Sequence, residues 1–209
     1  MNVYAFWTGT NEMSETRKQC LKTLSNTQCD VWLVTPNNLH QFLLEDHPLH
    51  EAYQYLSETH KSDYLRTYFM HFYGGGYTDI KTTSTSWIES FSKLYASNAW
   101  INGYPEIPTG VAYKPAEQYW NELVGNGAYI CKPNTPLTLE WYSEMIKLMD
   151  DRLERLREHP ATHPRDCAEY SEYPIEWNEM LGRIFHKVCY KYRHKLLRTL
   201  PAPQFENYI

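Results

Sequence analysis

The sequence has no block of basic residues, no long apolar run and no closely spaced pair of cysteines. Its formal net charge is −5, and without a basic cluster this charge argues against nucleic acid as a partner. A membrane-spanning helix needs about 20 consecutive apolar residues, and no stretch of the sequence approaches that length. We therefore expect neither nucleic-acid binding nor a membrane span.

The cysteines are odd in number and widely scattered: Cys20, Cys29, Cys131, Cys167 and Cys189. This spacing fits neither a disulfide framework nor a zinc site. The first nine residues also lack the positive charge and the cleavage site of a secretory signal. Together these absences favour reduced thiols and a cytoplasmic protein, in the host cytoplasm if the protein is viral.

The sequence does have enough length for one α/β domain, and it is rich in aromatic rings. It contains 18 tyrosines and 7 tryptophans, which can stack on sugars or bases but can equally fill a core. A chain of 209 residues suits one domain with a proper core. We expect this domain over residues 1–200, and the proline-flanked residues 201–209 as a tail or the start of a linker to a further domain.

The apolar and polar pattern predicts strands that alternate with helices. We expect strands over residues 3–8, 30–35, 98–104, 126–132 and 195–200. We expect helices over residues 14–25, 62–73, 137–158 and 175–190, broken helical turns over 38–60, and a loop over 159–174. This alternation is typical of an α/β fold with a mostly parallel sheet flanked by helices.

Residues 61–83 hold the most informative pattern. We expect Ser62 to cap a helix with Asp63 in its first turn, and three glycines from Gly74 onward to end it. A strand should follow and end at Asp79. A carboxylate at the carboxyl end of a buried strand lies where α/β folds bind their ligands.

The segments Ser62-Asp63-Tyr64-Leu65-Arg66 and Tyr73-Gly74-Gly75-Gly76-Tyr77-Thr78-Asp79 resemble a known motif. They are similar to the sugar-binding DXD region of GT-A glycosyltransferases of the capsular-polysaccharide and mannosyltransferase types, whose pattern runs S-D-x-x-R, then Y-G-G-x-Y-x-D-x-D. The likeness extends loosely to the first strand and to residues 126–133. The chain also resembles the transferase domain of a large chlorovirus glycosylation protein. The likeness implies a GT-A-like fold with a single Rossmann-like, mixed and mostly parallel sheet.

The resemblance also implies an activity. In such enzymes a nucleotide-sugar binds over the carboxyl ends of the first strands, and a hexose passes from it to a hydroxyl of a glycan acceptor; we expect a UDP-sugar. A Mn²⁺ or Mg²⁺ ion offsets the charge that builds on the diphosphate, which would make Asp79 a metal ligand and a catalytic residue. The alternative is a domain that binds a sugar-nucleotide or a glycan without catalysing transfer.

The chain departs from this pattern at one position, because Lys81 replaces the second acid. Asp79 and Lys81 would share a face of a strand. Either Asp79 alone holds the metal while Lys81 binds a phosphate oxygen, or Lys81 replaces the metal; a plain surface ion pair is the third alternative. We expect the metal to be retained, since Asp79 would otherwise have little reason to face the diphosphate.

The resemblance implies further donor-binding residues. Asp63 and Arg66 are three positions apart on one helix face, where they would hold the ribose or sugar and orient the donor. The remaining candidates follow the first strand or open a late one: Thr8, Gly9, Thr10, Asn126 and Gly127. An ordinary turn or a local ion pair would account for the same residues.

An inverting reaction also needs a base to accept the proton of the acceptor hydroxyl. The candidates are Glu176 and Glu179, which follow Pro174 at the expected start of the last helix. Acids in the first turn of a helix also suit its dipole without any catalytic role. A retaining reaction would need no base at this position.

Overall fold

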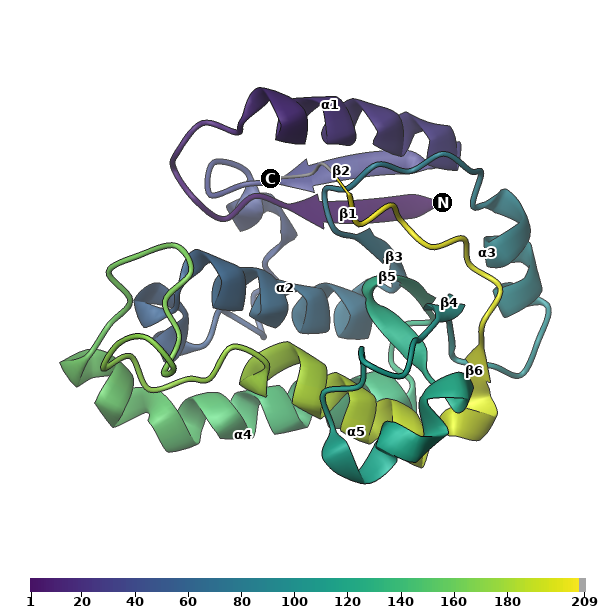
Figure 1. The fold of residues 1–209 in the computed structure, drawn as a ribbon. Helices are drawn as coiled ribbons and strands as arrows, with labels where there is room; N and C mark the ends of the chain where they lie inside the picture. Colours follow the sequence, from purple (N-terminus) through teal and green to yellow (C-terminus); the bar gives the residue numbers. More distant parts are fainter. Residues whose placement is uncertain (207–209) are drawn as a thin grey trace.

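The computed structural model describes residues 1–206, so residues 207–209 of the expected tail lie outside the described residues. Its centre is a six-stranded sheet in the order β2-β1-β3-β5-β4-β6 (Figure 1). The strands are β1 (Asn2–Phe6), β2 (Asp30–Val34), β3 (Gly75–Thr78), β4 (Ile101–Pro105), β5 (Val124–Cys131) and β6 (Leu196–Leu197). Three of the five pairings are parallel, which confirms the predicted mixed and mostly parallel sheet.

Helices cover both faces of this sheet. They are α1 (Glu15–Thr23), α2 (Glu58–Phe72), α3 (Ile88–Tyr95), α4 (Pro136–Glu158) and α5 (Ile184–Lys191). Figure 1 shows α1 and α3 on one side and α2, α4 and α5 on the other. The alternation of side chains along β1 explains this arrangement. Tyr4 and Phe6 pack towards α2, whereas Val3 and Ala5 pack towards α3 and α1.

The connection between α2 and β3 depends on glycine. Gly74 and Gly75 have φ angles of 63° and 82°, in the left-handed region that favours glycine. A Cβ atom on Gly74 would lie 2.5 Å from the ring of Pro133, and one on Gly75 would lie 2.7 Å from the carbonyl oxygen of Asn2. The predicted helix break is therefore confirmed, and it delivers the chain directly into β3.

The predicted start of α2 is wrong. The helix begins at Glu58, and the side chain of Ser57 caps it by accepting a hydrogen bond from the backbone N–H of His60. Ser62 and Asp63 lie inside the helix instead of at its start. The physical reason is that Ser57 is buried against His60 and Tyr173, which a local reading of the sequence does not show.

The last predicted helix also begins later than expected. Residues 177–178 form a turn, a π-helical turn covers Glu179–Arg183, and only then does α5 begin. The carboxylate of Glu179 accepts the backbone N–H of Glu176 at 3.0 Å and pairs with Arg152 of α4 at 2.7 Å. These two contacts hold residues 176–179 in a turn that is docked on α4.

The other predicted elements are confirmed to within a few residues, including the late strand that becomes β6. Short 3-10 turns occupy Leu24–Thr27, Leu39–Phe42, Glu51–Tyr55, Lys114–Glu122 and Arg193–Lys195. Within residues 1–206 no helix has the length and apolar character that crossing a membrane requires.

Candidate active site

The carboxyl ends of β1 and β3 meet at one edge of the sheet, because these two strands are parallel. Strand β5 runs in the opposite direction, so its first residues lie at the same edge. Asp79 follows β3 directly, and its backbone N–H donates to the carbonyl of Gly127 at 2.8 Å. The structure thus brings together the predicted site residues from three separate parts of the sequence.

Four charged side chains form a cluster at this edge: Asp63, Arg66, Asp79 and Lys81. Arg66 lies between the two carboxylates, 3.4 Å from Asp63 and 3.3 Å from Asp79. Lys81 Nζ lies 2.5 Å from Asp79 Oδ2. Asp63, Arg66 and Lys81 are only 3%, 9% and 7% exposed. A buried charged cluster of this kind is costly unless its members pair well or bind a ligand.

The carboxylate of Asp79 is held on both oxygens. Tyr77 donates its hydroxyl to Oδ1 at 2.6 Å, and Lys81 donates to Oδ2. Burial alone would raise the pKa of Asp79, but the charges of Arg66 and Lys81, together with these hydrogen bonds, hold the pKa below its ordinary value. Asp79 is therefore ionised at neutral pH.

Asp63 behaves differently from Asp79. Burial raises the pKa of Asp63 to about 7, the charge of Arg66 opposes this rise, and the charge of Asp79 adds to it. Two neighbouring carboxyl groups thus have well-separated pKa values because only one of them has strong donors on both oxygens. Perturbed carboxyl groups of this kind are typical of functional sites.

Arg66 links α2 to the rest of the site. Its guanidinium lies over the ring of Tyr77, 4.5 Å from the centroid, and it donates to the carbonyl of Asn126 at 3.3 Å. Its buried Nε has no hydrogen-bond partner among the described residues. The predicted role of Arg66 as an orienting cation thus fits its central position.

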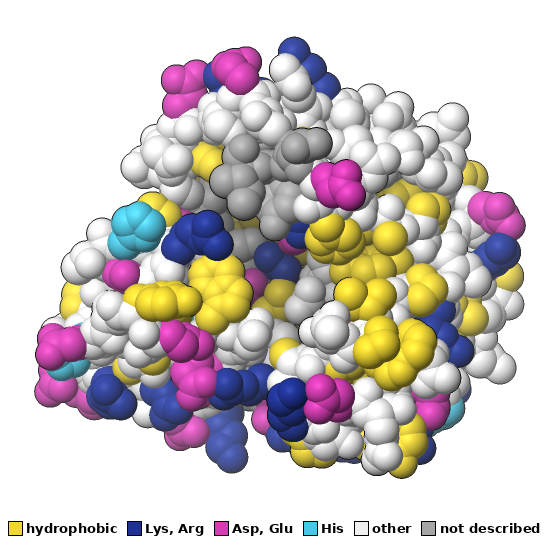
Figure 2. Space-filling model, viewed as in Figure 1, with side chains coloured by type: hydrophobic (Ala, Val, Ile, Leu, Met, Phe, Trp, Pro, Cys, Tyr) yellow, Lys and Arg dark blue, Asp and Glu magenta, His cyan; other side chains and the backbone are white. Residues whose placement is uncertain are grey.

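Gly127 packs directly beside Asp79, Tyr104 and Phe205. A Cβ atom at this position would lie 3.2 Å from the hydroxyl of Tyr104, 3.4 Å from Asp79 Oδ2 and 3.6 Å from the ring of Phe205. Any side chain here would crowd these groups. In the view of Figure 2 the surface is hollowed between β1 and α2, and basic and acidic side chains lie deep in the hollow.

The C-terminal segment forms part of the site, which the sequence did not reveal. The backbone N–H of Gln204 donates to the carbonyl of Thr82 at 2.9 Å. The ring of Phe205 then lies 4.4 Å from Lys81 Nζ and 5.9 Å from the ring centre of Tyr104. An aromatic residue among tail prolines gives no local signal of this contact. Tyr77 was missed as well, although it stands two positions before Asp79 within the recognised pattern.

The three residues after β1 occupy the expected edge. The hydroxyl of Thr8 donates to the carbonyl of Glu58 at 2.6 Å, which ties the end of β1 to the start of α2. A Cβ atom on Gly9 would meet the side chain of Asn11, and Thr10 is exposed. Donor binding by these residues stays a prediction.

A cavity of about 660 Å³ lies next to the charged cluster. Asn126, Asn178 and Arg183 line it together with the loop over residues 109–114. Asn126 connects the cavity to the cluster, because its carbonyl accepts the hydrogen bond from Arg66. The polar lining suits a ligand that carries many hydroxyl groups.

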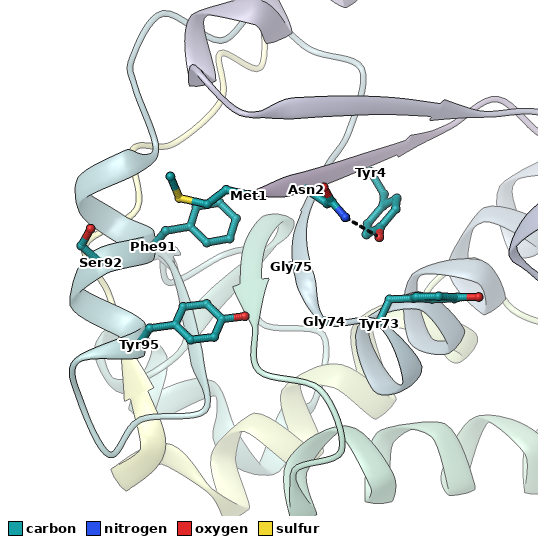
Figure 3. Close-up of a pocket in the computed structure, with 9 residues that line it drawn as sticks. All are labelled: Met1, Asn2, Tyr4, Tyr73, Gly74, Gly75, Phe91, Ser92 and Tyr95. Atoms are coloured by element: carbon teal, nitrogen blue, oxygen red, sulfur yellow. Dashed lines mark hydrogen bonds between the residues drawn. The ribbon is translucent and has the colours of Figure 1, made fainter.

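Figure 3 shows a different hollow, of about 420 Å³, at the opposite end of β1 and β3. It is lined by Asn2 and Gly75 from the beginnings of these strands and by aromatic rings such as Tyr73 and Tyr95. No carboxylate, lysine, arginine or histidine is among its described lining residues. It therefore lies away from the charged cluster.

The two predicted bases, Glu176 and Glu179, differ in their partners. Glu176 pairs with Arg183, which lines the cavity. Both oxygens of Glu179 are engaged, one by Arg152 and the other by the backbone N–H of Glu176. Glu179 opens the π-helical turn, whereas Glu176 precedes it, so the expected helix start is wrong for Glu176.

The residues around Asp79 do not fit a divalent cation. Among the described residues, no group of three or more His, Cys, Asp or Glu side chains could hold a metal ion. A cation bound to Asp79 Oδ2 would lie about 4 Å from Lys81 Nζ. That contact would be repulsive and would oppose the attraction between the cation and the carboxylate. The expected Mn²⁺ or Mg²⁺ stays a prediction that this donor set does not favour.

The mixed six-stranded sheet between two layers of helices is that of an α/β fold of the GT-A type. Residues 1–102, just under half of the chain, match the family described as capsular polysaccharide synthesis protein. The matched part includes α2, β3 and the whole charged cluster.

The fold is similar to that of a solved structure named PaToxG glycosyltransferase, with a TM-score of 0.52. The identity is 14%, over 91% of this chain and 69% of that one, so the likeness shows a shared fold. A search of curated proteins finds no match. Together, the family match and the shared fold support a GT-A-like glycosyltransferase and glycosyl transfer in general, as the sequence predicted.

Proposed function

We propose that this protein transfers a hexose from a nucleotide-diphosphate sugar, with a UDP-sugar favoured, to a hydroxyl group of a glycan. The observation that carries the proposal is the buried cluster in which Arg66 and Lys81 both contact Asp79 at the carboxyl edge of the sheet. Two cations at the carboxyl edge of the sheet suit an anionic diphosphate.

The proposed reaction gives a role to Arg66, Lys81 and Asp79. In the reaction, the bond between the anomeric carbon and the diphosphate oxygen breaks, and its electron pair leaves with the nucleoside diphosphate. The oxygen of the acceptor hydroxyl forms the new bond to the anomeric carbon. Arg66 and Lys81 stabilise the charge that builds on the leaving diphosphate, because they are fixed in place before the reaction begins. Asp79 positions both cations.

The acceptor occupies the polar cavity beside Asn126 in this proposal. Its hydroxyl proton passes to a base if the reaction inverts the anomeric carbon. Glu176 suits this role better than Glu179, since its partner Arg183 lines the cavity and both oxygens of Glu179 are engaged elsewhere. No step is routed through a metal ion, because the residues at Asp79 do not fit one.

The proposal places the protein in the cytoplasm, and its thiols support that location. All five cysteines are free, and four of them are buried. A cytoplasmic enzyme would meet nucleotide-sugars directly.

The test is a screen of UDP-, GDP- and dTDP-sugars by thermal shift, followed by an assay for nucleotide release. A ligand that binds the folded state raises its apparent stability by mass action. We expect a UDP-sugar to raise the melting temperature and to release UDP when glycan acceptors are added. Binding without release under any acceptor condition would favour the alternative, a binding domain without transferase activity. No binding of any nucleotide-sugar would refute the proposal.

A further inference from the structure

We propose that Lys81 takes the place of the divalent cation, so that Lys81 and Arg66 bind the donor diphosphate directly and without metal. This inference rests on the proposed glycosyl transfer and goes further, because it names the groups that hold the diphosphate. The motif that this chain resembles has an acid at the position of Lys81. The inference therefore assigns a function to the residue at which the chain departs from the motif.

The position of the ammonium group is the first argument. Lys81 Nζ contacts the same carboxylate that a metal ion would need, and at 2.5 Å it lies against Asp79 Oδ2. An ammonium group carries three hydrogen-bond donors. It can therefore keep its bond to Asp79 and donate to a phosphate oxygen at the same time, which is how a bridging metal ion works.

The balance of charge is the second argument. Arg66 and Lys81 both pair with Asp79, and Arg66 also pairs with Asp63. Each phosphate of a nucleotide-sugar adds a negative charge, which these two cations can attract once the ligand arrives. Adding a divalent cation at Asp79 would instead place it beside the ammonium group of Lys81.

The surroundings of the ammonium group are the third argument. Lys81 is 7% exposed, and the ring of Phe205 lies 4.4 Å from its Nζ. A ring face attracts a cation without replacing its hydrogen bonds. Burial also strengthens any electrostatic contact with a phosphate.

The test is calorimetric titration of UDP and of UDP-glucose into the full chain, first with EDTA and then with Mn²⁺. We expect both ligands to bind with EDTA, and Mn²⁺ to change their affinities by less than about threefold. This comparison uses the unaltered protein, so it does not depend on whether a variant folds. Binding that requires Mn²⁺ would overturn the inference and leave the proposed function standing. No binding of UDP or UDP-glucose in either condition would count against both.

Variants at position 81 test whether Lys81 itself contacts the diphosphate. Losing a hydrogen bond to a charged group costs about 10- to 100-fold in affinity, so Lys81→Gln should weaken UDP binding by that factor. Uridine, which has no phosphate, should bind both proteins equally. Lys81→Arg keeps the charge and should retain UDP binding within about tenfold. Lys81→Asp recreates the acidic pair of the resembled pattern, and its UDP binding should become dependent on Mn²⁺.

The matched control is Lys93→Gln, which removes an exposed lysine that pairs with Glu89 on α3. It should leave UDP affinity unchanged. If Lys81→Gln binds UDP as tightly as the unaltered protein, or weakens uridine and UDP equally, Lys81 does not contact the diphosphate and the inference fails.

Discussion

Asp63 places an ionisable carboxyl group inside the protein, where Arg66 is its ion-pair partner. Burial raises the pKa of Asp63 to about 7 from an ordinary value of 3.8. The folded state therefore binds a proton more tightly than the unfolded state does. Linkage then requires that this group lowers stability as pH rises from about 4 to about 7, with no further change above that range.

Replacing Asp63 by Asn should remove this dependence. The free energy of unfolding of Asp63→Asn, relative to the unaltered protein, should rise between about pH 4 and pH 7 and then level off. The measurement is urea denaturation across this range, with Asp46→Asn on the exposed surface as the control. His60, whose pKa burial lowers to about 4, has the opposite effect, but it is present in both proteins and cancels. A flat difference would show that Asp63 is ionised throughout.

The sequence predicted the residues of the cluster better than their contacts. Asp79 and Lys81 were expected side by side, and their ion pair confirms it. The reason given was a shared strand face, but β3 ends at Thr78 and the two residues lie beyond it. Phe205 could not be predicted, because it reaches the site from a segment more than 100 residues away in sequence. Only the folded chain brings these groups together.

Helix α2 carries Asp63 and Arg66, so the residue that caps it also sets the position of half the cluster. Ser57 accepts the backbone N–H of His60, and its hydroxyl lies 3.2 Å from the ring Nδ1 of the same histidine. Ser62, the expected cap, stands inside the helix. Serine inside a helix is slightly less favourable than alanine.

The two serines provide a matched pair of substitutions. Ser57→Ala should lower the free energy of unfolding by about 1–2 kcal/mol, because the cap is lost and a buried ring nitrogen loses a partner. Ser62→Ala should change it by less than about 0.5 kcal/mol, with stabilisation favoured. Urea denaturation at pH 7 measures both values. Equal effects of the two substitutions would contradict the cap at Ser57.

The location of these helices was predictable, but their ends were not. Ser57 and Ser62 are each followed by an acid, so both read equally well as caps. The choice depends on Tyr173, whose hydroxyl lies 2.9 Å from His60 Nδ1 across the fold. The late start of α5 has a similar cause, since Arg152 of α4 holds Glu179. Tertiary contacts decided both boundaries.

Across the whole molecule, the fold was predictable because the alternation of strands and helices extends through most of the chain. The division into a domain over residues 1–200 and a tail stays a prediction. Gln204 and Phe205 nevertheless lie on the charged cluster, and Figure 1 shows the final segment running from β6 back across the sheet.

The molecule as a whole is proposed to join a donor site at the edge of the sheet to an acceptor cavity beside Asn126. Asp79 is the residue on which both cations of the donor site depend. Loss of the Asp79 carboxylate should therefore lower the reaction rate strongly. Circular dichroism checks that the variant remains folded.

The rate of nucleotide release from a UDP-hexose by Asp79→Ala tests this account most directly. The unaltered protein should release UDP in the presence of a glycan acceptor, and Asp79→Ala should do so about 100-fold more slowly or worse, by analogy with the loss of one transition-state stabiliser. Asp46→Asn should match the unaltered protein. An Asp79→Ala variant that binds the donor and turns over at the unaltered rate would contradict the assignment of this cluster as the donor site.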